Sequence, residues 1–128
     1  MYLNWFKKNE DYFFFVFRVI FGIVFLLHGL FKLGVLGNPA MTGLMLVVGI
    51  GEVLVGLGII FGLFTRLAAV GGLIIMIGAL VTAHFPKGLN PLANGGEPAY
   101  LFFAAFLVIL ALGYKKWGLD GLFKKEVF

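Results

Sequence analysis

Ionisable side chains inside long apolar segments are the residues of this chain that could do chemistry. Arg18, His28 and Lys32 occur along the first apolar run, and Glu52 lies in the middle of the second. An ionised side chain near the centre of a bilayer costs roughly 2.5–3.5 kcal/mol to insert, so such residues are kept where they pair, bind a ligand or move protons. The sequence therefore predicts a polar site inside a membrane protein.

The polar residues of the first run share one helical face. Steps of 3, 4, 3 and 4 residues separate Arg18, Phe21, Phe25, His28 and Lys32. This spacing places their side chains on one stripe of an α-helix. The stripe is expected to face the bundle interior or a wet cavity, although cationic side chains near the ends of a span can also reach the membrane surface.

Glycines flank Glu52 on its own helical face, with Gly49 three residues before it and Gly56 four residues after it. They would let a neighbouring helix approach the carboxylate closely. If the first two segments are antiparallel neighbours, Arg18 and Glu52 differ in depth by about one helical turn. We therefore predict an ion pair between Arg18 and Glu52, which either fixes helix register or forms the floor of a site.

A second group of polar residues is expected near the outer surface, where His28, Lys32, His84, Lys87 and Glu97 would meet. Two histidines and a glutamate could bind a metal, and two histidines could bind haem. No HxxxH or HExxH spacing supports either site, so we assign no metal and favour contact to an oxygen-rich ligand, with histidine as proton carrier. The candidate ligand-binding residues are Arg18, Phe25, His28, Lys32, Glu52, His84 and Glu97.

Four apolar segments must position these side chains: residues 13–33, 40–64, 67–85 and 98–114. About 20 apolar residues cross a hydrocarbon layer of about 30 Å as a helix. Hydrophobic residues make up 62% of the chain. Charged residues make up 12%, against about 25% in a soluble domain. The sequence therefore predicts one all-α domain over residues 1–128, an integral membrane four-helix bundle with up-down-up-down topology.

The basic residues predict the orientation of this bundle. If the chain crosses four times, one side of the membrane collects Lys7, Lys8, Arg66, Lys115, Lys116, Lys124 and Lys125. Positive residues collect on the cytoplasmic side, so both termini are expected there and the protein in the plasma membrane as a multi-pass protein. The net charge of +4 then reflects topology, and no nucleic-acid partner is expected.

Three segments resemble the DoxX family of small four-span membrane proteins: HGLFKL at 28–33, GEVLVGLGIIFGLFTRLAA at 51–69 and NGGE at 94–97. The likeness runs over all four apolar segments in order. It implies an association with redox or quinone chemistry, since the family takes its name from a subunit associated with a thiosulfate:quinone oxidoreductase of sulfur-oxidising archaea. It also implies that Arg18 and Glu52 are the family's polar residues in spans one and two.

Two classes of function fit these observations. The first is a membrane subunit that binds a quinone-like or other lipophilic ligand between its helices, or anchors a soluble or membrane-bound oxidoreductase. The second is a small-molecule or proton-coupled transporter, against which a neutralised Glu52 argues because a paired carboxylate is a poor cation trap. The lipid bilayer is the expected partner in either case, and a homo-oligomer is compatible with both.

Cysteine is absent, which excludes thiolate chemistry within this polypeptide. No self-contained catalytic motif occurs, so the sequence leaves open whether the chain is an enzyme. No intrinsic cofactor is expected, and a quinone is the candidate ligand for redox chemistry.

Overall fold

The computed structural model describes residues 2–122, and these form helices joined by turns, with no β-strand among them. The predicted all-helical class is confirmed. Two helices of membrane-spanning length and hydropathy are α2 (Glu10–Lys32) and α3 (Leu44–Phe61). A third such stretch, Thr65–Lys87, is built from α4 (Thr65–Ala79), the π-helical turn η1 (Leu80–His84) and the 3-10 turn η2 (Phe85–Lys87).

A fourth apolar helix, α6 (Glu97–Leu112), is shorter than the other three. At about 1.5 Å per residue its 16 residues extend about 24 Å. The remaining elements are the short helices α1 (Tyr2–Lys8) and α5 (Pro91–Asn94) and the 3-10 turn η3 (Leu119–Leu122).

Local backbone chemistry sets where the helices begin and end, and these boundaries do not coincide with the ends of the apolar segments. Helix α2 begins at Glu10, before the apolar residues, because Glu10 and Asp11 in its first turn complement the positive end of the helix dipole. Helix α3 begins only at Leu44, because the chain through Pro39 is turn-like and Gly43 adopts a φ of +63° just before the helix. Gly62, with a φ of +61°, ends α3 in the left-handed conformation that favours glycine.

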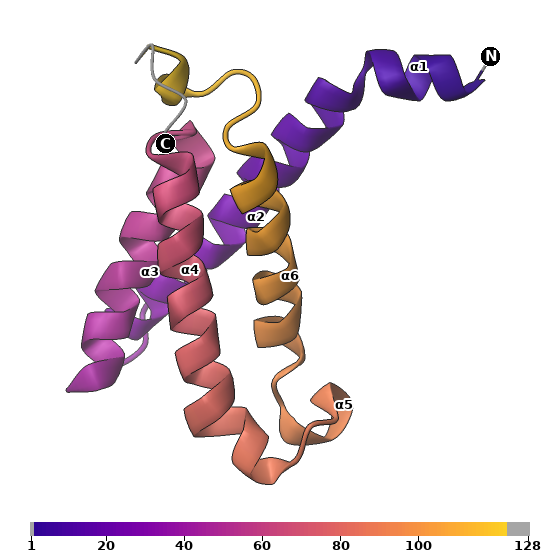
Figure 1. The fold of residues 1–128 in the computed structure, drawn as a ribbon. Coiled ribbons are helices and arrows are strands. Elements are labelled where there is room, and N and C mark those ends of the chain that lie inside the picture. Colours follow the sequence, from indigo (N-terminus) through magenta and orange to yellow (C-terminus); the bar gives the residue numbers. More distant parts are fainter. Residues whose placement is uncertain (1, 123–128) are drawn as a thin grey trace.

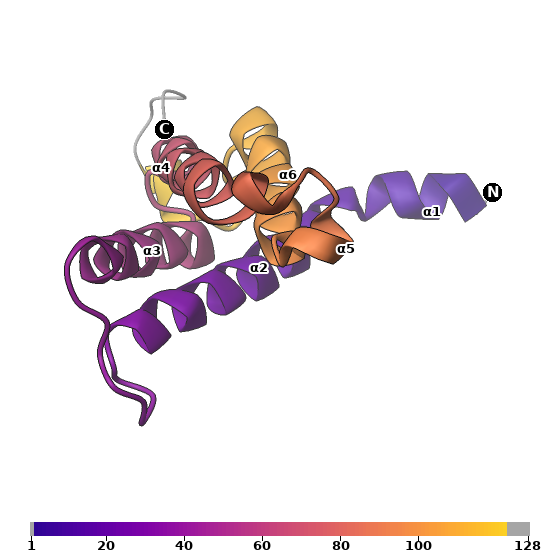
Figure 2. The same ribbon diagram turned by 90° about the horizontal axis from the view of Figure 1, so that it is seen from below.

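The helices form a bundle in which one member crosses the others. Helices α3, α4 and α6 lie side by side, whereas α2 runs obliquely across them (Figure 1, Figure 2). Helix α2 packs mainly on α3, and α4 packs on both α3 and α6. Helix α1 points away from the bundle (Figure 1). The extensive contact between α2 and α3 decides which of their polar residues can meet.

Glycines bring the backbones of α2 and α3 into direct contact. A methyl group on Gly56 would lie 2.9 Å from the Cα atom of Leu26, and one on Gly29 would lie 2.8 Å from the carbonyl oxygen of Gly49. Neither neighbour is a flexible side-chain tip that could move aside. These glycines therefore set the distance between the two helices.

Replacing Gly56 by alanine should destabilise the protein by about 1–3 kcal/mol, because the new methyl group must push α2 away from α3. Gly78 in α4 is the matched control, since a methyl group there meets no atom within 4 Å among the described residues. Gly78→Ala should be neutral or stabilising by up to about 1 kcal/mol, because alanine favours the helix. Thermal unfolding in detergent compares the two variants, and equal effects would contradict the close packing.

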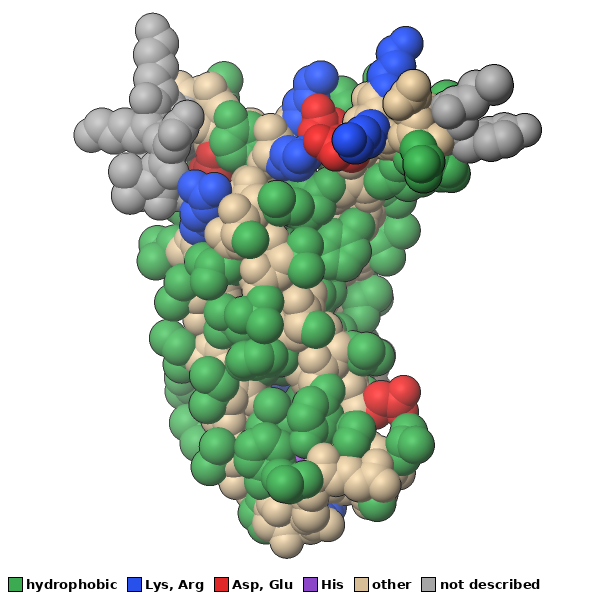
Figure 3. All heavy atoms as spheres, turned by 45° about the vertical axis from the view of Figure 1, so that its right-hand side comes forward, with side chains coloured by type: hydrophobic (Ala, Val, Ile, Leu, Met, Phe, Trp, Pro, Cys, Tyr) green, Lys and Arg blue, Asp and Glu red, His purple; other side chains and the backbone are tan. Residues whose placement is uncertain are grey.

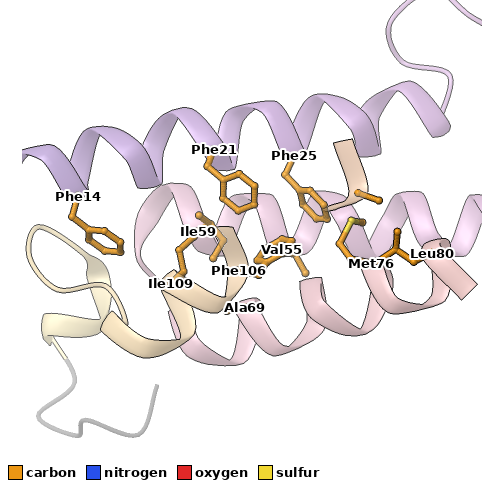
Figure 4. Packing of buried hydrophobic residues seen from close by; sticks show 11 residues of the cluster. Phe14, Phe21, Phe25, Val55, Ile59, Ala69, Met76, Leu80, Phe106 and Ile109 are labelled. Atoms are coloured by element: carbon orange, nitrogen blue, oxygen red, sulfur yellow. The ribbon is translucent and has the colours of Figure 1, made fainter. Parts of the chain in front are cut away.

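Aromatic and aliphatic side chains from all four long helices fill the middle of the bundle (Figure 4). Phe25 and Phe106 are fully buried and meet edge to face, with ring centroids 4.9 Å apart. This core separates two polar ends of the bundle. The histidine end holds His28 and His84, which line one cavity. The basic end holds Arg66, Lys115 and Lys116, together with Lys7 and Lys8 in the last turn of α1. Figure 3 shows cationic side chains gathered at one end above hydrophobic flanks.

Candidate functional site

A cavity of about 270 Å³ lies at the histidine end, open on one side and lined by residues of α2, α3, the α4–η1 stretch and the start of α6. Its lining is mostly apolar and includes Ile75, Met76 and Phe102. The polar side chains that reach it are His28, Lys32, Glu52, Thr82 and His84. Four of the seven predicted ligand-binding residues therefore line one space.

An ion pair forms one side of the cavity. The Nζ atom of Lys32 lies 2.7 Å from Oε1 of Glu52, whose side chain is 3% exposed. Gly49 makes this possible, because a methyl group there would lie 2.7 Å from Cβ of Lys32. The prediction that small residues let a neighbouring helix reach Glu52 is thus confirmed, but the side chain that reaches it is Lys32 and not Arg18.

The predicted ion pair between Arg18 and Glu52 is wrong. The antiparallel register of α2 and α3 sets Gly22 against Ile60 and Leu26 against Gly56. Arg18 therefore lies beside the end of α3, while Glu52 lies beside the last turn of α2. The depth estimate assumed that the ends of the two helices are level, whereas Arg18, well inside α2, already lies beside Gly62 at the end of α3, so the first turns of α2 extend beyond α3.

His84 is held from behind by the loop that precedes α6. Its Nδ1 atom lies 3.1 Å from the carbonyl oxygen of Asn94. Gly96 packs against the imidazole, since a methyl group on Gly96 would lie 2.8 Å from Cγ of His84. The ring itself lies on the π-helical turn η1, a local widening of the helix that often occurs at functional sites.

Asn94 organises this loop and was missed as an individual site residue. It is 1% exposed, its amide donates to the carbonyl of Gly88 at 2.9 Å, and its side-chain oxygen accepts from the N–H of Gly96 at 2.7 Å. Gly95 between them adopts a φ of +74°. An asparagine followed by two glycines is a turn signal that could have indicated this brace.

The three other predicted ligand residues lie outside the cavity. Phe25 is fully buried in the core, where its ring contacts that of Phe102 at 5.4 Å. Glu97 is exposed at the first turn of α6, where a carboxylate complements the helix dipole. Arg18 lies at the basic end. Phe102 is a lining residue that sequence reasoning did not select, and His28 meets it edge-on at 5.1 Å.

Comparison with known proteins identifies the family. The DoxX family model matches residues 13–85, more than half of the chain, including Arg18, Lys32, Glu52 and both histidines. The chain belongs to the DoxX family. An uncharacterized protein of Haemophilus influenzae is 32% identical over 134 residues, which cover 97% of this chain and 100% of that protein. No solved structure gives a significant match.

DoxX membership supports a membrane protein of a family often linked to redox-related functions. In this DoxX protein, no set of three His, Cys, Asp or Glu side chains within residues 2–122 is arranged to hold a metal ion. The cavity instead offers one ammonium group, one carboxylate and two imidazoles against apolar walls.

Arg18 of this DoxX protein holds the chain that follows α6. It is fully buried and donates to the carbonyl oxygens of Tyr114 at 2.7 Å, Lys116 at 3.3 Å and Trp117 at 2.9 Å. We call residues 114–120 the C-terminal clasp, because they fold across the basic end of the bundle. A planar guanidinium can serve several carbonyls at once, which a lysine ammonium does with less geometric definition.

Asp120 fastens the other end of the clasp to the start of α4. Its carboxylate accepts hydrogen bonds from the backbone N–H groups of Phe64 and Thr65 and from the Thr65 hydroxyl at 2.6 Å. It thereby supplies from a distant position the capping oxygen that a helix N-terminus requires. The FTR part of the family-like segment 51–69 therefore builds the basic end, where Arg66 also donates to the Leu110 carbonyl.

Surface charges at the basic end add to these contacts. Lys115 lies 3.3 Å from Oε1 of Glu10 and 3.6 Å from Oδ1 of Asp11. The hydrogen bond to Glu10 raises the pKa of Lys115 above its ordinary value. The predicted cytoplasmic residues Lys124 and Lys125 lie outside the described part of the chain.

Proposed function

We propose that this protein is a membrane subunit linked to redox chemistry that binds a quinone-like or other lipophilic ring in the cavity at the histidine end. The single observation that supports this most is the cavity itself, in which apolar walls converge with Lys32, Glu52, His28 and His84. A ring of this class needs apolar contact for its carbons and polar contact for its oxygens.

The size of the cavity suits a ring rather than a whole lipid. Ligand pockets for drug-sized molecules measure roughly 300–1,000 Å³. This cavity, at about 270 Å³, lies just below that range. An isoprenoid or alkyl tail would therefore extend beyond it, among the lipid-facing side chains. We propose that electrons pass to or from a partner oxidoreductase, because the chain has no cysteine with which to carry thiol redox chemistry.

We further propose that the chain crosses the plasma membrane four times in up-down-up-down order, with both termini cytoplasmic and the cavity near the outer surface. The basic end, which carries four of the six lysines within residues 2–122, supports this orientation. A cysteine-free chain allows a direct test. A membrane-impermeant maleimide should label Leu89→Cys in intact cells and Lys8→Cys only after permeabilisation, and the reverse pattern would overturn the orientation.

Ligand binding can be measured on the purified protein in nanodiscs by titration with a short-chain ubiquinone analogue. Ala79→Phe adds a ring into the lining of the cavity, so it should weaken binding at least about tenfold. Val16→Phe, at an exposed position of α2, adds the same bulk outside the cavity and should leave affinity unchanged. Absence of binding to the unmodified protein, or equal binding by both variants, would refute the proposed function.

A further inference from the structure

The contact between His84 and Asn94 specifies which imidazole nitrogen carries a proton. The Nδ1 atom of His84 lies 3.1 Å from the backbone carbonyl oxygen of Asn94. A carbonyl oxygen can only accept a hydrogen bond, so Nδ1 must donate. In a neutral imidazole the other nitrogen, Nε2, then has a free lone pair and acts as an acceptor.

The loop around Asn94 is braced by hydrogen bonds, and it holds His84 in this tautomer. Asn94 is buried, and its side chain bonds to Gly88 and Gly96 at either end of the loop. The loop therefore cannot turn the Asn94 carbonyl away without losing both bonds. Because Nδ1 is engaged with the loop and the ring lines the cavity, Nε2 is the nitrogen left to meet a ligand.

The other polar groups of the cavity complement this acceptor. Lys32 brings an ammonium group, which is a donor only, and its contact at 2.7 Å engages Oε1 of Glu52. A ligand oxygen that accepts can therefore bind near Lys32, and a ligand oxygen near His84 must donate. A carbonyl oxygen placed against Nε2 would set two lone pairs against each other.

We infer that the cavity selects a ring bearing a phenol- or hydroquinone-type hydroxyl, which donates a hydrogen bond to Nε2 of His84. This rests on the proposed function and narrows it, because the reduced, hydroxylated form of a quinone-like ring is then preferred over the oxidised, carbonyl form. Asn94 acts as a positioning residue, because its carbonyl fixes which nitrogen of His84 carries the proton and it affects the ligand only in that way.

Three probes of one ring skeleton test the preference: trimethylhydroquinone, its dimethyl ether and trimethylquinone. They are titrated anaerobically into the protein in nanodiscs, at a pH well above the ordinary titration range of imidazole. The hydroquinone should bind about tenfold more tightly than the ether or the quinone, since both of those lack the hydroxyl donor. Equal binding of the three, or tighter binding of the quinone, would overturn this inference alone, whereas no binding of any probe would overturn the proposed function with it.

His84→Asn separates the two roles of the imidazole. The asparagine amide can still donate to the Asn94 carbonyl from near the Nδ1 position, but nothing replaces Nε2, so the preference for the hydroquinone should disappear. The control Thr82→Val removes the side-chain hydroxyl of the lining, which already donates to the Gly78 carbonyl, and should retain the preference. Loss of the preference in Thr82→Val or Glu52→Gln, with His84→Asn unaffected, would assign the acceptor elsewhere and refute the inference.

A spectroscopic measurement needs no substitution of His84 itself. The chain contains two histidines, so the ring nitrogens of a ¹⁵N-histidine-labelled sample give few signals, and His28→Gln assigns them. His84 should show a protonated Nδ1 and an unprotonated Nε2. The opposite tautomer would overturn the inference even if every variant of His84 failed to fold.

Discussion

Replacing Arg18 by methionine should release the C-terminal clasp and destabilise the protein by about 3–5 kcal/mol, because buried backbone acceptors lose their donors. Methionine fills a similar volume but donates no hydrogen bond. The carbonyl groups of Tyr114, Lys116 and Trp117 would each lose a charged donor, and hydrogen bonds to charged groups contribute about 1.5–3 kcal/mol each. Arg18 is fully buried, so water does not readily replace it.

Two measurements report on this variant in detergent or nanodiscs. Thermal unfolding gives the loss of stability, and trypsin digestion reports the clasp, because cleavage after Lys115 and Lys116 should become faster once the segment is released. Arg18→Lys should give an intermediate result, since an ammonium keeps the charge without the planar fork.

The control for Arg18→Met is Lys116→Ala. Its side chain is 55% exposed and lies 3.9 Å from Asp11, so removing it should change stability by no more than about 1 kcal/mol. Unchanged stability and unchanged digestion of Arg18→Met would contradict the assignment of Arg18 as the residue that holds the clasp.

Replacing Lys32 alone by methionine should destabilise the protein by about 3–5 kcal/mol, because the Glu52 carboxylate would remain buried without its cation. The carboxylate is 3% exposed, and the lysine side chain that neutralises it is 18% exposed. Replacing both residues, in Lys32→Met with Glu52→Met, should recover most of the loss, because two methionines can pack at this position without any charge.

The double-mutant cycle of these variants measures the coupling between the two side chains. A strong coupling is expected between Lys32 and Glu52, and none between Arg18 and Glu52, because Arg18 lies beside Gly62 at the end of α3 whereas Glu52 lies near the middle of that helix. Additive losses in the first cycle, or strong coupling in the second, would restore the ion pair that the apolar runs suggested.

The nature and broad position of the helices could be read from the chain. Long apolar runs predict α2, α3 and α4, and the buried Glu52 with flanking Gly49 and Gly56 predicts a close helix contact around a carboxylate. The step pattern from Arg18 to Lys32 predicts a shared helical face, and His28, Lys32 and His84 were expected together. Periodicity and hydropathy are local properties, so they carry this much information without any knowledge of the neighbours.

Only the tertiary structure shows which charged residue on the face of α2 pairs with Glu52 on α3. A helical stripe specifies which side chains share a face but not how far one helix slides along another. Arg18 and Lys32 lie on the same stripe about four turns apart, so only the register of α2 against α3 decides which of them meets Glu52. Glycine contacts such as Gly56 against Leu26 set that register, and they involve residues distant in the chain. The same holds for Asp120 at the start of α4, because a side chain that caps a remote backbone leaves no periodic signal. The chain thus specifies a polar site within a membrane bundle, while the packing of its backbones decides which charges pair and which nitrogen of His84 bonds to the loop before α6.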